Sequence, residues 1–416
     1  MSKWSFDTKA IHSGFNQDSK TGATSLPIYQ TAAFAYNTAE ELADVFSGRK
    51  FGYLYSRISN PTVTALERRV AALEDGVCAL ACSSGMAAIA TAIYTLAKSG
   101  DHIVSSRSLY GGTLQLFSEI FEENGIEIDY VDTTDSAAYE AAIKGNTRLI
   151  FVESLGNPKL DVPPFEAIAK IAAAHQIPLI VDSTLTTPYL FNPKAWGVAV
   201  VIHSATKYLA GSGHVIGGIL VDLGTFNWKQ SKSPALAEEA KKFGEFAFIA
   251  RARKKILQNT GSCIAPLSAY LLNLGLETLG LRMKQHCDNA LALATFLDHH
   301  PGVKEVGYTG LVSNPHHRDA TRYFNGRYGG LLTFRLDSKE SCYKFINSLK
   351  LAKNLANLGD SKTLVIHPAS TIYCDIDEKS QQEAGVYCNL IRVSVGIEDP
   401  TDIIADFEQA LKESLQ

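Results

Sequence analysis

The sequence predicts an α/β fold, with a large domain built on a mainly parallel sheet of seven strands and a smaller C-terminal α/β domain. Three observations favour this fold class. The 416 residues are too many for one ordinary hydrophobic core. Between residues 60 and 226, short apolar runs alternate with helical patterns, which is typical of a parallel sheet covered on both faces. A shorter alternation of strand and helix patterns follows towards the C-terminus.

The first 60 residues are rich in polar and turn-forming residues and are only loosely periodic. We interpret them as an arm and not as a domain, and a partner subunit is a candidate for what the arm contacts. The expected division is therefore an arm over residues 1–60, a large domain over 61–255 and a small domain over 256–416.

The large domain contains seven strand candidates separated by helical patterns. In sheets of this kind, ligands bind beyond the carboxyl ends of the strands. The helical pattern over 165–175 follows two prolines, which suits a helix start. The predicted strands cover residues 78–82, 102–105, 126–131, 149–153, 178–182, 200–203 and 218–221, and the predicted helices cover 62–73, 85–97, 112–123 and 165–175.

The C-terminal half begins with a charged stretch over 227–253 that we expect to be helical or loop-like. A long helical pattern covers 266–299, and we expect Gly275 and Gly280 to break it. Strands are predicted over 329–336, 364–366 and 390–395, and a closing helix over 403–415.

The composition excludes several classes of function. A net charge of −4 provides no basic field for a nucleic acid or a membrane surface. The longest apolar runs, such as residues 177–181, have the length of a strand and are too short to span a bilayer. No apolar signal core occurs over residues 1–5, so a cytoplasmic location is expected. The seven cysteines are scattered without a C-x-x-C pair, so neither disulfides nor a metal site are expected.

The most informative stretch is Ser204-Ala205-Thr206-Lys207, which follows a predicted strand. A lysine at such a place becomes a nucleophilic amine if the site lowers its pKa. The hydroxyl groups of Ser204 and Thr206 are suited to bind a phosphate. The alternative is a lysine that is simply solvated at the end of a strand.

A carboxylate, Asp182, ends the apolar run over 178–182. A buried carboxylate needs a cationic partner, and a protonated pyridine nitrogen is one such partner. The alternative is a cap for the segment that follows.

Two strand-to-helix turns carry further candidates. Ser84, Gly85 and Met86 stand where a helix would begin, and a helix N-terminus offers free N–H groups to an anion. In the next turn, Tyr110 is placed to lay its ring on an aromatic cofactor, although tyrosines in such turns are often packing residues.

Two residues further along the chain are candidates for polar contacts to a ligand. Asn157 follows a predicted strand and is suited to bind a ring hydroxyl, although Asn before Pro is common in plain turns. Arg392 lies within an apolar strand, where its guanidinium suits a substrate carboxylate or an internal salt bridge. A candidate phosphate site, an aromatic ring, an acid and a lysine thus follow one another at successive strand ends of one sheet. This order favours the functional interpretations over the structural alternatives.

With these residues in place, the chain resembles the Cys/Met-metabolism family of fold-type-I enzymes that depend on pyridoxal 5′-phosphate (PLP). The resemblance spans nearly the whole length. It rests on residues 55–62, 84–87, 110–113, 181–184 and 204–208.

The resemblance implies a role for each matching residue. Lys207 would hold PLP as a Schiff base and move protons, Asp182 would face the ring nitrogen, and Tyr110 would stack on the ring and act as an acid/base group. Arg392 would bind the substrate carboxylate, and Asn157 is a further candidate for contact with the cofactor and the substrate. The implied phosphate and neighbouring-subunit ligands are Ser84, Gly85, Met86, Ser204, Thr206, Tyr55 and Arg57.

The resemblance implies a homo-oligomer, with a dimer of dimers as the expected assembly, because Tyr55 and Arg57 are expected to reach the site of a neighbouring subunit. Tyr55 is also a candidate for contact with the substrate. The expected ligands are an amino acid substrate with sulfide or a small thiol, and neither a nucleic acid nor a membrane is expected to be a partner.

Residues 153–158, 275–279, 358–364 and 395–399 are similar to O-acetylhomoserine sulfhydrylases. The resemblance implies a transferase that replaces the γ-acetoxy group of O-acetylhomoserine with sulfide or a small thiol, giving homocysteine or methionine plus acetate. Alternatives are a methionine or cystathionine γ-lyase, a cystathionine γ-synthase, or a non-catalytic PLP-binding regulatory protein. A dehydrogenase is disfavoured because the first turn lacks G-x-G-x-x-G.

Several positions depart from the family pattern. Gly112 stands where methionine γ-lyases commonly carry cysteine, which disfavours that activity. Tyr373 stands where the sulfhydrylases usually have histidine, Ser183 replaces a common asparagine, and residues 211–214 have an unusual order. These departures leave the implied cofactor contacts in place and bear on the choice of acyl donor and sulfur nucleophile.

Overall fold

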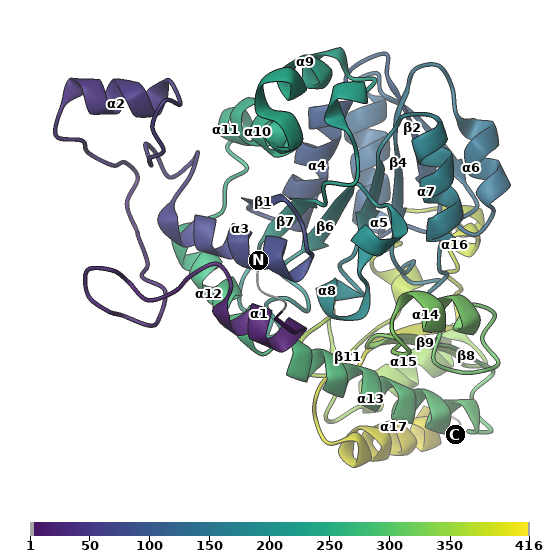
Figure 1. Ribbon diagram of the computed structural model, residues 1–416. Coiled ribbons are helices and arrows are strands. Elements are labelled where there is room, and N and C mark those ends of the chain that lie inside the picture. The colour runs from purple at the N-terminus through teal and green to yellow at the C-terminus, as the bar shows by residue number, and fades with distance from the viewer. Residues whose placement is uncertain (1–3, 415–416) are drawn as a thin grey trace.

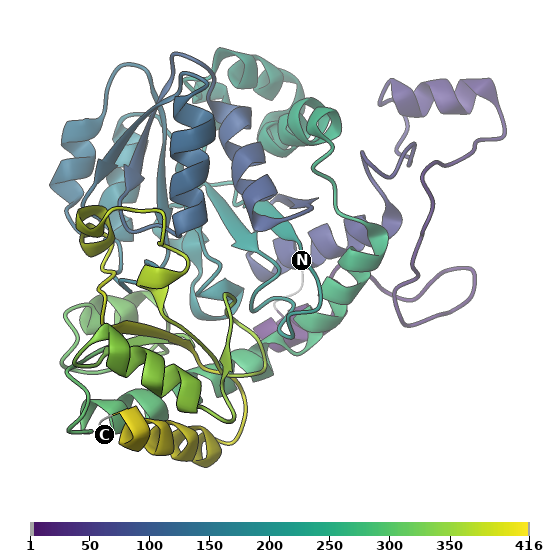
Figure 2. The same cartoon turned by 180° about the vertical axis from the view of Figure 1, so that it is seen from behind.

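The computed structural model describes residues 4–414 as a large α/β unit, a smaller α/β unit and an N-terminal segment that projects from them (Figures 1 and 2). The undescribed residues include the start of the stretch over 1–5 and Leu415, the last residue of the predicted closing helix. No helix within residues 4–414 combines the length and the apolar character needed to cross a lipid bilayer.

The large unit is built on a seven-stranded sheet with the order β1-β7-β6-β5-β4-β2-β3. Strand β7 runs antiparallel to both of its neighbours, and the other six strands share one direction. The mainly parallel sheet predicted from the sequence is therefore confirmed. Its strands are β1 (Cys78–Cys82), β2 (His102–Ser106), β3 (Glu127–Val131), β4 (Thr147–Glu153), β5 (Leu179–Asp182), β6 (Val200–Ser204) and β7 (Gly218–Asp222).

Helices cover both faces of this sheet (Figure 1). In β4, Ile150 and Val152 belong to the hydrophobic core on one face, whereas Leu149 and Phe151 belong to the core on the other. Because successive side chains of a strand point to opposite faces, a strand buried on both sides is apolar throughout. The covering helices are α3 (Pro61–Leu73), α4 (Gly85–Leu96), α5 (Gly111–Gln115), α6 (Ser136–Ala142), α7 (Phe165–Ala174), α8 (Thr187–Leu190), α9 (Pro234–Phe243) and α10 (Ala247–Arg251).

The smaller unit has a five-stranded sheet with the order β10-β11-β12-β9-β8, packed against helices α13, α15 and α17 around a third core cluster. Its strands are β8 (Glu305–Gly307), β9 (Leu331–Arg335), β10 (Lys353–Asn354), β11 (Leu364–Ile366) and β12 (Leu390–Ser394). Its helices are α13 (Leu279–Asp298), α14 (His317–Tyr323), α15 (Lys339–Ser348), α16 (Glu378–Glu383) and α17 (Pro400–Ser414).

The ten predicted strands are confirmed to within two residues at each end, and only the short strands β8 and β10 were not anticipated. The helix predicted over 112–123 consists of α5 followed by a π-helical segment, Leu116–Glu122. The stretch over 227–253 contains α9 and α10, as its helical or loop-like pattern indicated.

The prediction that Gly275 and Gly280 break the long helical pattern is wrong. The break lies at Thr278, between α12 (Pro266–Glu277) and α13, and each glycine lies inside a helix. A Cβ on Gly275 would lie 2.6 Å from the carbonyl oxygens of Leu209 and Ala210. A glycine in this helix therefore serves close approach of two backbones, which a sequence pattern does not distinguish from a helix break.

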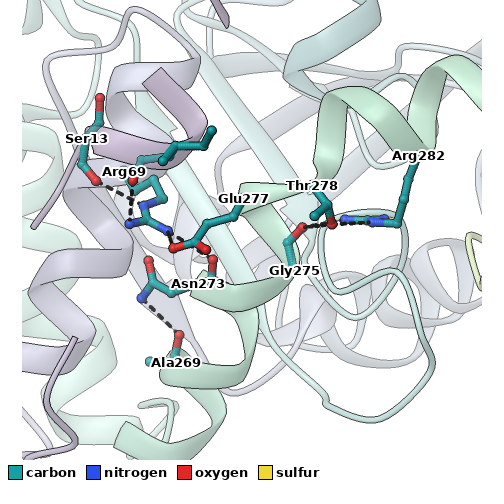
Figure 3. A network of polar contacts seen from close by, with 9 residues as sticks. Ser13, Arg69, Ala269, Asn273, Gly275, Glu277, Thr278 and Arg282 are labelled. Carbon is teal, nitrogen blue, oxygen red and sulfur yellow. Dashed lines mark hydrogen bonds and ion pairs between the residues drawn. The ribbon is translucent and has the colours of Figure 1, made fainter. Parts of the chain in front are cut away.

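The junction of α12 and α13 contacts the chain just after Lys207. Arg282 donates a hydrogen bond to the carbonyl oxygen of Tyr208 at 2.6 Å. It also donates one to the carbonyl oxygen of Gly275 (Figure 3). On the other side of the junction, Arg69 of α3 donates to the carbonyl oxygen of Ser13 at 2.9 Å, and it also contacts Asn273 and Glu277 (Figure 3). This polar network fixes the segment that follows Lys207 against the rest of the large unit.

The N-terminal segment has two parts. Helix α1 (Phe6–His12) packs on α3, α12 and α13 of its own chain. Helix α2 (Ala39–Phe46) projects away from the body (Figure 1). Its last residue, Phe46, is 68% exposed, and Phe51, five residues later, is 75% exposed. The core cluster of the large unit also includes Ile264 and Leu272, which lie beyond residue 255. The division of the chain at residues 60 and 255 therefore stays a prediction.

The close approach at Gly275 predicts the effect of adding a methyl group. Helix propensity alone favours Gly275→Ala by about 1 kcal/mol. The overlap with two backbone carbonyls costs about 3 kcal/mol, because backbone atoms cannot swing aside. We therefore expect Gly275→Ala to lower the thermal midpoint by a few degrees. Gly145→Ala is the matched control, because a Cβ on Gly145 meets nothing within 4 Å, and equal midpoints for the two variants would contradict this packing argument.

Candidate active site

One cavity lies at the carboxyl edge of the large sheet, where the turns after β1, β2, β4, β5 and β6 meet the loop before β11. Its volume is about 240 Å³. It is lined by Ser84, Gly85, Met86, Ile89, Tyr110, Thr113, Glu153, Leu155, Asn157, Asp182, Thr184, Leu185, Ser204, Thr206, Lys207, Ile216, Ala356, Asn357, Leu358, Ile372 and Arg392. Ten of the twelve residues singled out from the sequence are in this set.

The two that the structure does not bring here are Tyr55 and Arg57. Both lie on the projecting N-terminal segment, where Arg57 donates a hydrogen bond to the carbonyl oxygen of Gln258 and its guanidinium lies over the ring of Tyr55. Their expected contact with the site of a neighbouring subunit stays a prediction.

Lys207 lies just past β6 and is partly buried. Its Nζ donates a hydrogen bond to Oδ1 of Asn357 at 2.7 Å. Burial, and then the positive charge of Arg392, lower the pKa of Lys207 to about 8. A larger share of this lysine is therefore uncharged near neutral pH than of an exposed one. The alternative of a lysine solvated at a strand end does not hold.

Asp182 ends β5 inside the cavity. Its Oδ1 accepts a hydrogen bond from the backbone N–H of Thr184 at 2.9 Å, which closes a turn. The next helix, α8, begins at Thr187 and has Thr186 at its N-cap position, so the alternative that Asp182 caps a helix is wrong. Burial raises the pKa of Asp182, although the hydrogen bonds of Thr184 oppose that shift. Within residues 4–414, no lysine or arginine pairs with this carboxylate. A ligand that carries a protonated ring nitrogen would supply the missing cation.

Glu153, next to Asp182 in the sheet register, is a site residue that sequence reasoning missed. Its Oε1 accepts the backbone N–H of Tyr110 at 2.7 Å. Burial and then the charge of Asp182 raise the pKa of Glu153 well above its ordinary value. Glu153 therefore fixes the turn that presents the Tyr110 ring, which is 43% exposed. A carboxylate at the end of an apolar strand, as at Asp182, was the signal that could have identified it.

The N-terminus of α4 forms one end of the cavity. Ser84 caps this helix, and its hydroxyl accepts the backbone N–H of Ala87 at 3.1 Å. The first N–H groups of a helix, here those of Gly85 and Met86, have no acceptor within the helix and attract an anion. A Cβ on Gly85 would lie 2.7 Å from Cβ of Ser204, so glycine lets the helix approach this hydroxyl residue.

Arg392 of β12 reaches the cavity from the smaller unit and is 3% exposed. Its Nη1 donates to Oδ1 of Asn157 at 3.1 Å, and its Nη2 donates to the carbonyl oxygen of Asn357 at 3.2 Å. Its Nε is buried and has no hydrogen-bond partner among the described residues. Because no described carboxylate forms a salt bridge with Arg392, the salt-bridge alternative is wrong and a ligand carboxylate is the fitting partner.

These groups fit PLP, the cofactor that the resemblance implies. Lys207 offers an amine for an aldehyde, Asp182 a carboxylate for a ring nitrogen, and α4 an N-terminus for a phosphate. Asn157 binds Arg392 through its side chain, so it is more than a turn residue. The Thr206 hydroxyl is already bonded to Gly217 at 3.1 Å, which makes it a weaker candidate phosphate ligand than the helix N-terminus.

Comparisons with known proteins point the same way. The model of the family described as Cys/Met metabolism PLP-dependent enzyme matches residues 7–412. O-acetyl-L-homoserine sulfhydrylase 1 of Thermus thermophilus is 42% identical over 418 residues, which cover 98% of this chain and 99% of that protein.

Two solved structures share the whole fold. A putative O-acetylhomoserine (thiol)-lyase of Campylobacter jejuni, which contains a pyridoxyl-lysine phosphate, has a TM-score of 0.94 and 37% identity, covering 98% of this chain and 100% of that one. A cystathionine gamma-lyase of Lactobacillus plantarum has a TM-score of 0.87 and 35% identity, covering 99% and 100%. The fold is therefore that of the fold-type-I PLP-dependent enzymes, and PLP is the cofactor. The chain belongs to the Cys/Met metabolism family of PLP-dependent enzymes.

Proposed function

We propose that the protein replaces the γ-acetoxy group of O-acetylhomoserine with sulfide or a small thiol, giving homocysteine or methionine plus acetate. The observation that carries the proposal is the placement of the Lys207 amine and the Arg392 guanidinium in one cavity, with Asn357 between them. This arrangement suits an α-amino acid, because Arg392 can bind its carboxylate while Lys207 accepts the proton on its α-carbon. The similarity to O-acetylhomoserine sulfhydrylase supports the choice of substrate.

Each residue has a separate task in this proposal. Arg392 binds the α-carboxylate of the substrate and fixes its orientation. Lys207, with its lowered pKa, accepts the α-proton. PLP, when bound, supplies an electron-withdrawing ring that accommodates negative charge on the substrate carbon.

Two further residues contact the ring of the cofactor, and a separate group holds its phosphate. Asp182 keeps the ring nitrogen charged, and the ring of Tyr110 covers one face of the cofactor. In this proposal the hydroxyl of Tyr110 also exchanges a proton as the acetate leaves and sulfur adds. The phosphate would be held by the N-terminus of α4 with Ser84, Gly85, Met86, Ser204 and Thr206.

The walls of the cavity suit a small acyl ester. Leu155, Leu185, Ile216 and Ile372 line it together with Met86. An apolar wall excludes water from the reacting carbon and accommodates the methyl group of an acetyl ester. The absence of a side chain at Gly112 matters as well, because a Cβ there would lie 2.6 Å from Cε1 of Tyr110. A cysteine at that position would require the ring to move, and the glycine here, where methionine γ-lyases commonly carry cysteine, disfavours that activity.

The assembly and the location of the protein are also proposals. We propose a homo-oligomer, as a dimer of dimers, in which Tyr55 and Arg57 complete the site of a neighbouring subunit. The exposed rings of Phe46 and Phe51 on the projecting segment support such a contact, because apolar surface of this kind is usually covered. We further propose a cytoplasmic location.

A substrate panel on the purified PLP-loaded protein tests the activity. We expect homocysteine and acetate from O-acetylhomoserine plus sulfide, because the cavity holds an amino acid and a small ester. Release of 2-oxobutanoate from methionine or cystathionine, without homocysteine synthesis, would contradict the proposal and favour a γ-lyase. No turnover of any member of the panel would favour a non-catalytic PLP-binding protein.

The role of Arg392 predicts a selective kinetic defect. Arg392→Met keeps the length of the side chain but removes the charge-assisted hydrogen bonds to the substrate carboxylate, which contribute about 1.5–3 kcal/mol. We expect kcat/KM for O-acetylhomoserine to fall about 10- to 150-fold. The control is Arg318→Met, because Arg318 is exposed and lies outside the cavity. Unchanged kcat/KM in Arg392→Met would show that Arg392 does not bind the substrate carboxylate.

A further inference from the structure

We propose that Asn357 is a positioning residue that holds the amine of Lys207 in place as an uncharged base. The inference deepens the proposed function, since it concerns the same site, but it depends only on the chemistry of Lys207 and not on the identity of the substrate. Asn357 lies in the loop between β10 and β11, about 150 residues after Lys207 in the chain.

The geometry joins Asn357 to both functional cations of the cavity. Its side-chain oxygen accepts a hydrogen bond from Nζ of Lys207 at 2.7 Å, and its backbone oxygen accepts one from Nη2 of Arg392 at 3.2 Å. Since Lys207 belongs to the large unit and Asn357 to the loops of the smaller sheet, this single residue sets the distance between the proton acceptor and the carboxylate clamp.

The chemistry of an amide suits this position. An amide oxygen accepts a hydrogen bond from an amine without carrying a formal charge. A carboxylate at the same place would stabilise the ammonium form of Lys207 and raise its pKa by about 1–3 units. Asparagine therefore holds the lysine while leaving its pKa low, at about 8.

Other charged and titratable groups face the same cavity from every packed element. Arg392 of β12 favours the uncharged amine. Asp182 of β5 and Glu153 of β4 are carboxyl groups whose own pKa values are raised by burial, and Tyr110 stands at the start of α5. Asn357 is the residue in direct hydrogen-bond contact with Nζ among those described, so its replacement changes the charge nearest to the amine.

The test compares Asn357→Asp and Asn357→Ala with the wild-type protein. Aspartate has the size of asparagine, so the fold is expected to be retained. Competitive acetylation of the cofactor-free protein over a pH series, read by mass spectrometry of the Lys207 peptide, measures the pKa of this amine without any turnover. We expect a midpoint near pH 8 in the wild type and a rise of about one unit or more in Asn357→Asp.

A kinetic measurement supplies the second arm. In the PLP-loaded Asn357→Ala variant we expect kcat to fall about tenfold or more, because general base catalysis depends on the position of the amine. KM for the amino acid should change less, since Arg392 is retained. In Asn357→Asp, the acid limb of the pH profile should move to higher pH together with the labelling midpoint.

Asn354→Asp is the matched control. Asn354 is exposed and lies three residues before Asn357, so this substitution adds the same charge outside the cavity. It should leave both the labelling midpoint and kcat unchanged. A labelling midpoint in Asn357→Asp equal to that of the wild type would overturn the inference, whatever the substrate is. If the wild-type protein made no homocysteine but the labelling midpoint still shifted in Asn357→Asp, the proposed function would be overturned and the role of Asn357 would be retained.

Discussion

The common direction of six strands in the large sheet is the constraint on which the candidate site depends. It brings the turns after β1, β2, β4, β5 and β6 to one edge, where Ser84, Tyr110, Asp182 and Lys207 meet. A sheet buried on both faces has little freedom to shift, because each strand packs against helices on two sides. The α12–α13 junction adds a second restraint through the hydrogen bond from Arg282 to the backbone that follows Lys207.

Two buried charges of opposite sign explain why this edge is suited to a zwitterionic amino acid and a charged ring. Among the described residues, no lysine or arginine forms an ion pair with Asp182 and no carboxylate forms one with Arg392, although most buried ions are paired. Each is held by neutral groups instead, Asp182 by the backbone of Thr184 and Arg392 by two asparagines. Charged groups of a bound ligand would supply the remaining stabilisation. Burial of Asp182 and Arg392 without ionic partners therefore favours binding of such a ligand in one orientation.

The sequence predicted the large sheet well, because burial on both faces imposes apolar runs such as the one that ends at Asp182. The candidate site residues just past those runs could be predicted as well, because ligands bind beyond the carboxyl ends of parallel strands. Asn357 could not be found in this way, since its contact with Lys207 arises only when a loop of the smaller sheet reaches the large one. Gly275 was misread because close packing and helix breaking require the same residue. Tyr55 and Arg57 rest on the family resemblance alone, and their predicted role involves a second subunit.

All of the proposed chemistry requires that the amine of Lys207 forms an imine with the cofactor. Reduction of the PLP-loaded protein with borohydride, followed by proteolysis and peptide mapping, tests it most directly because reduction fixes the cofactor to the residue that carries it. We expect a pyridoxyl group on the peptide that contains Lys207. A pyridoxyl group on another lysine, or on no peptide at all, would contradict it.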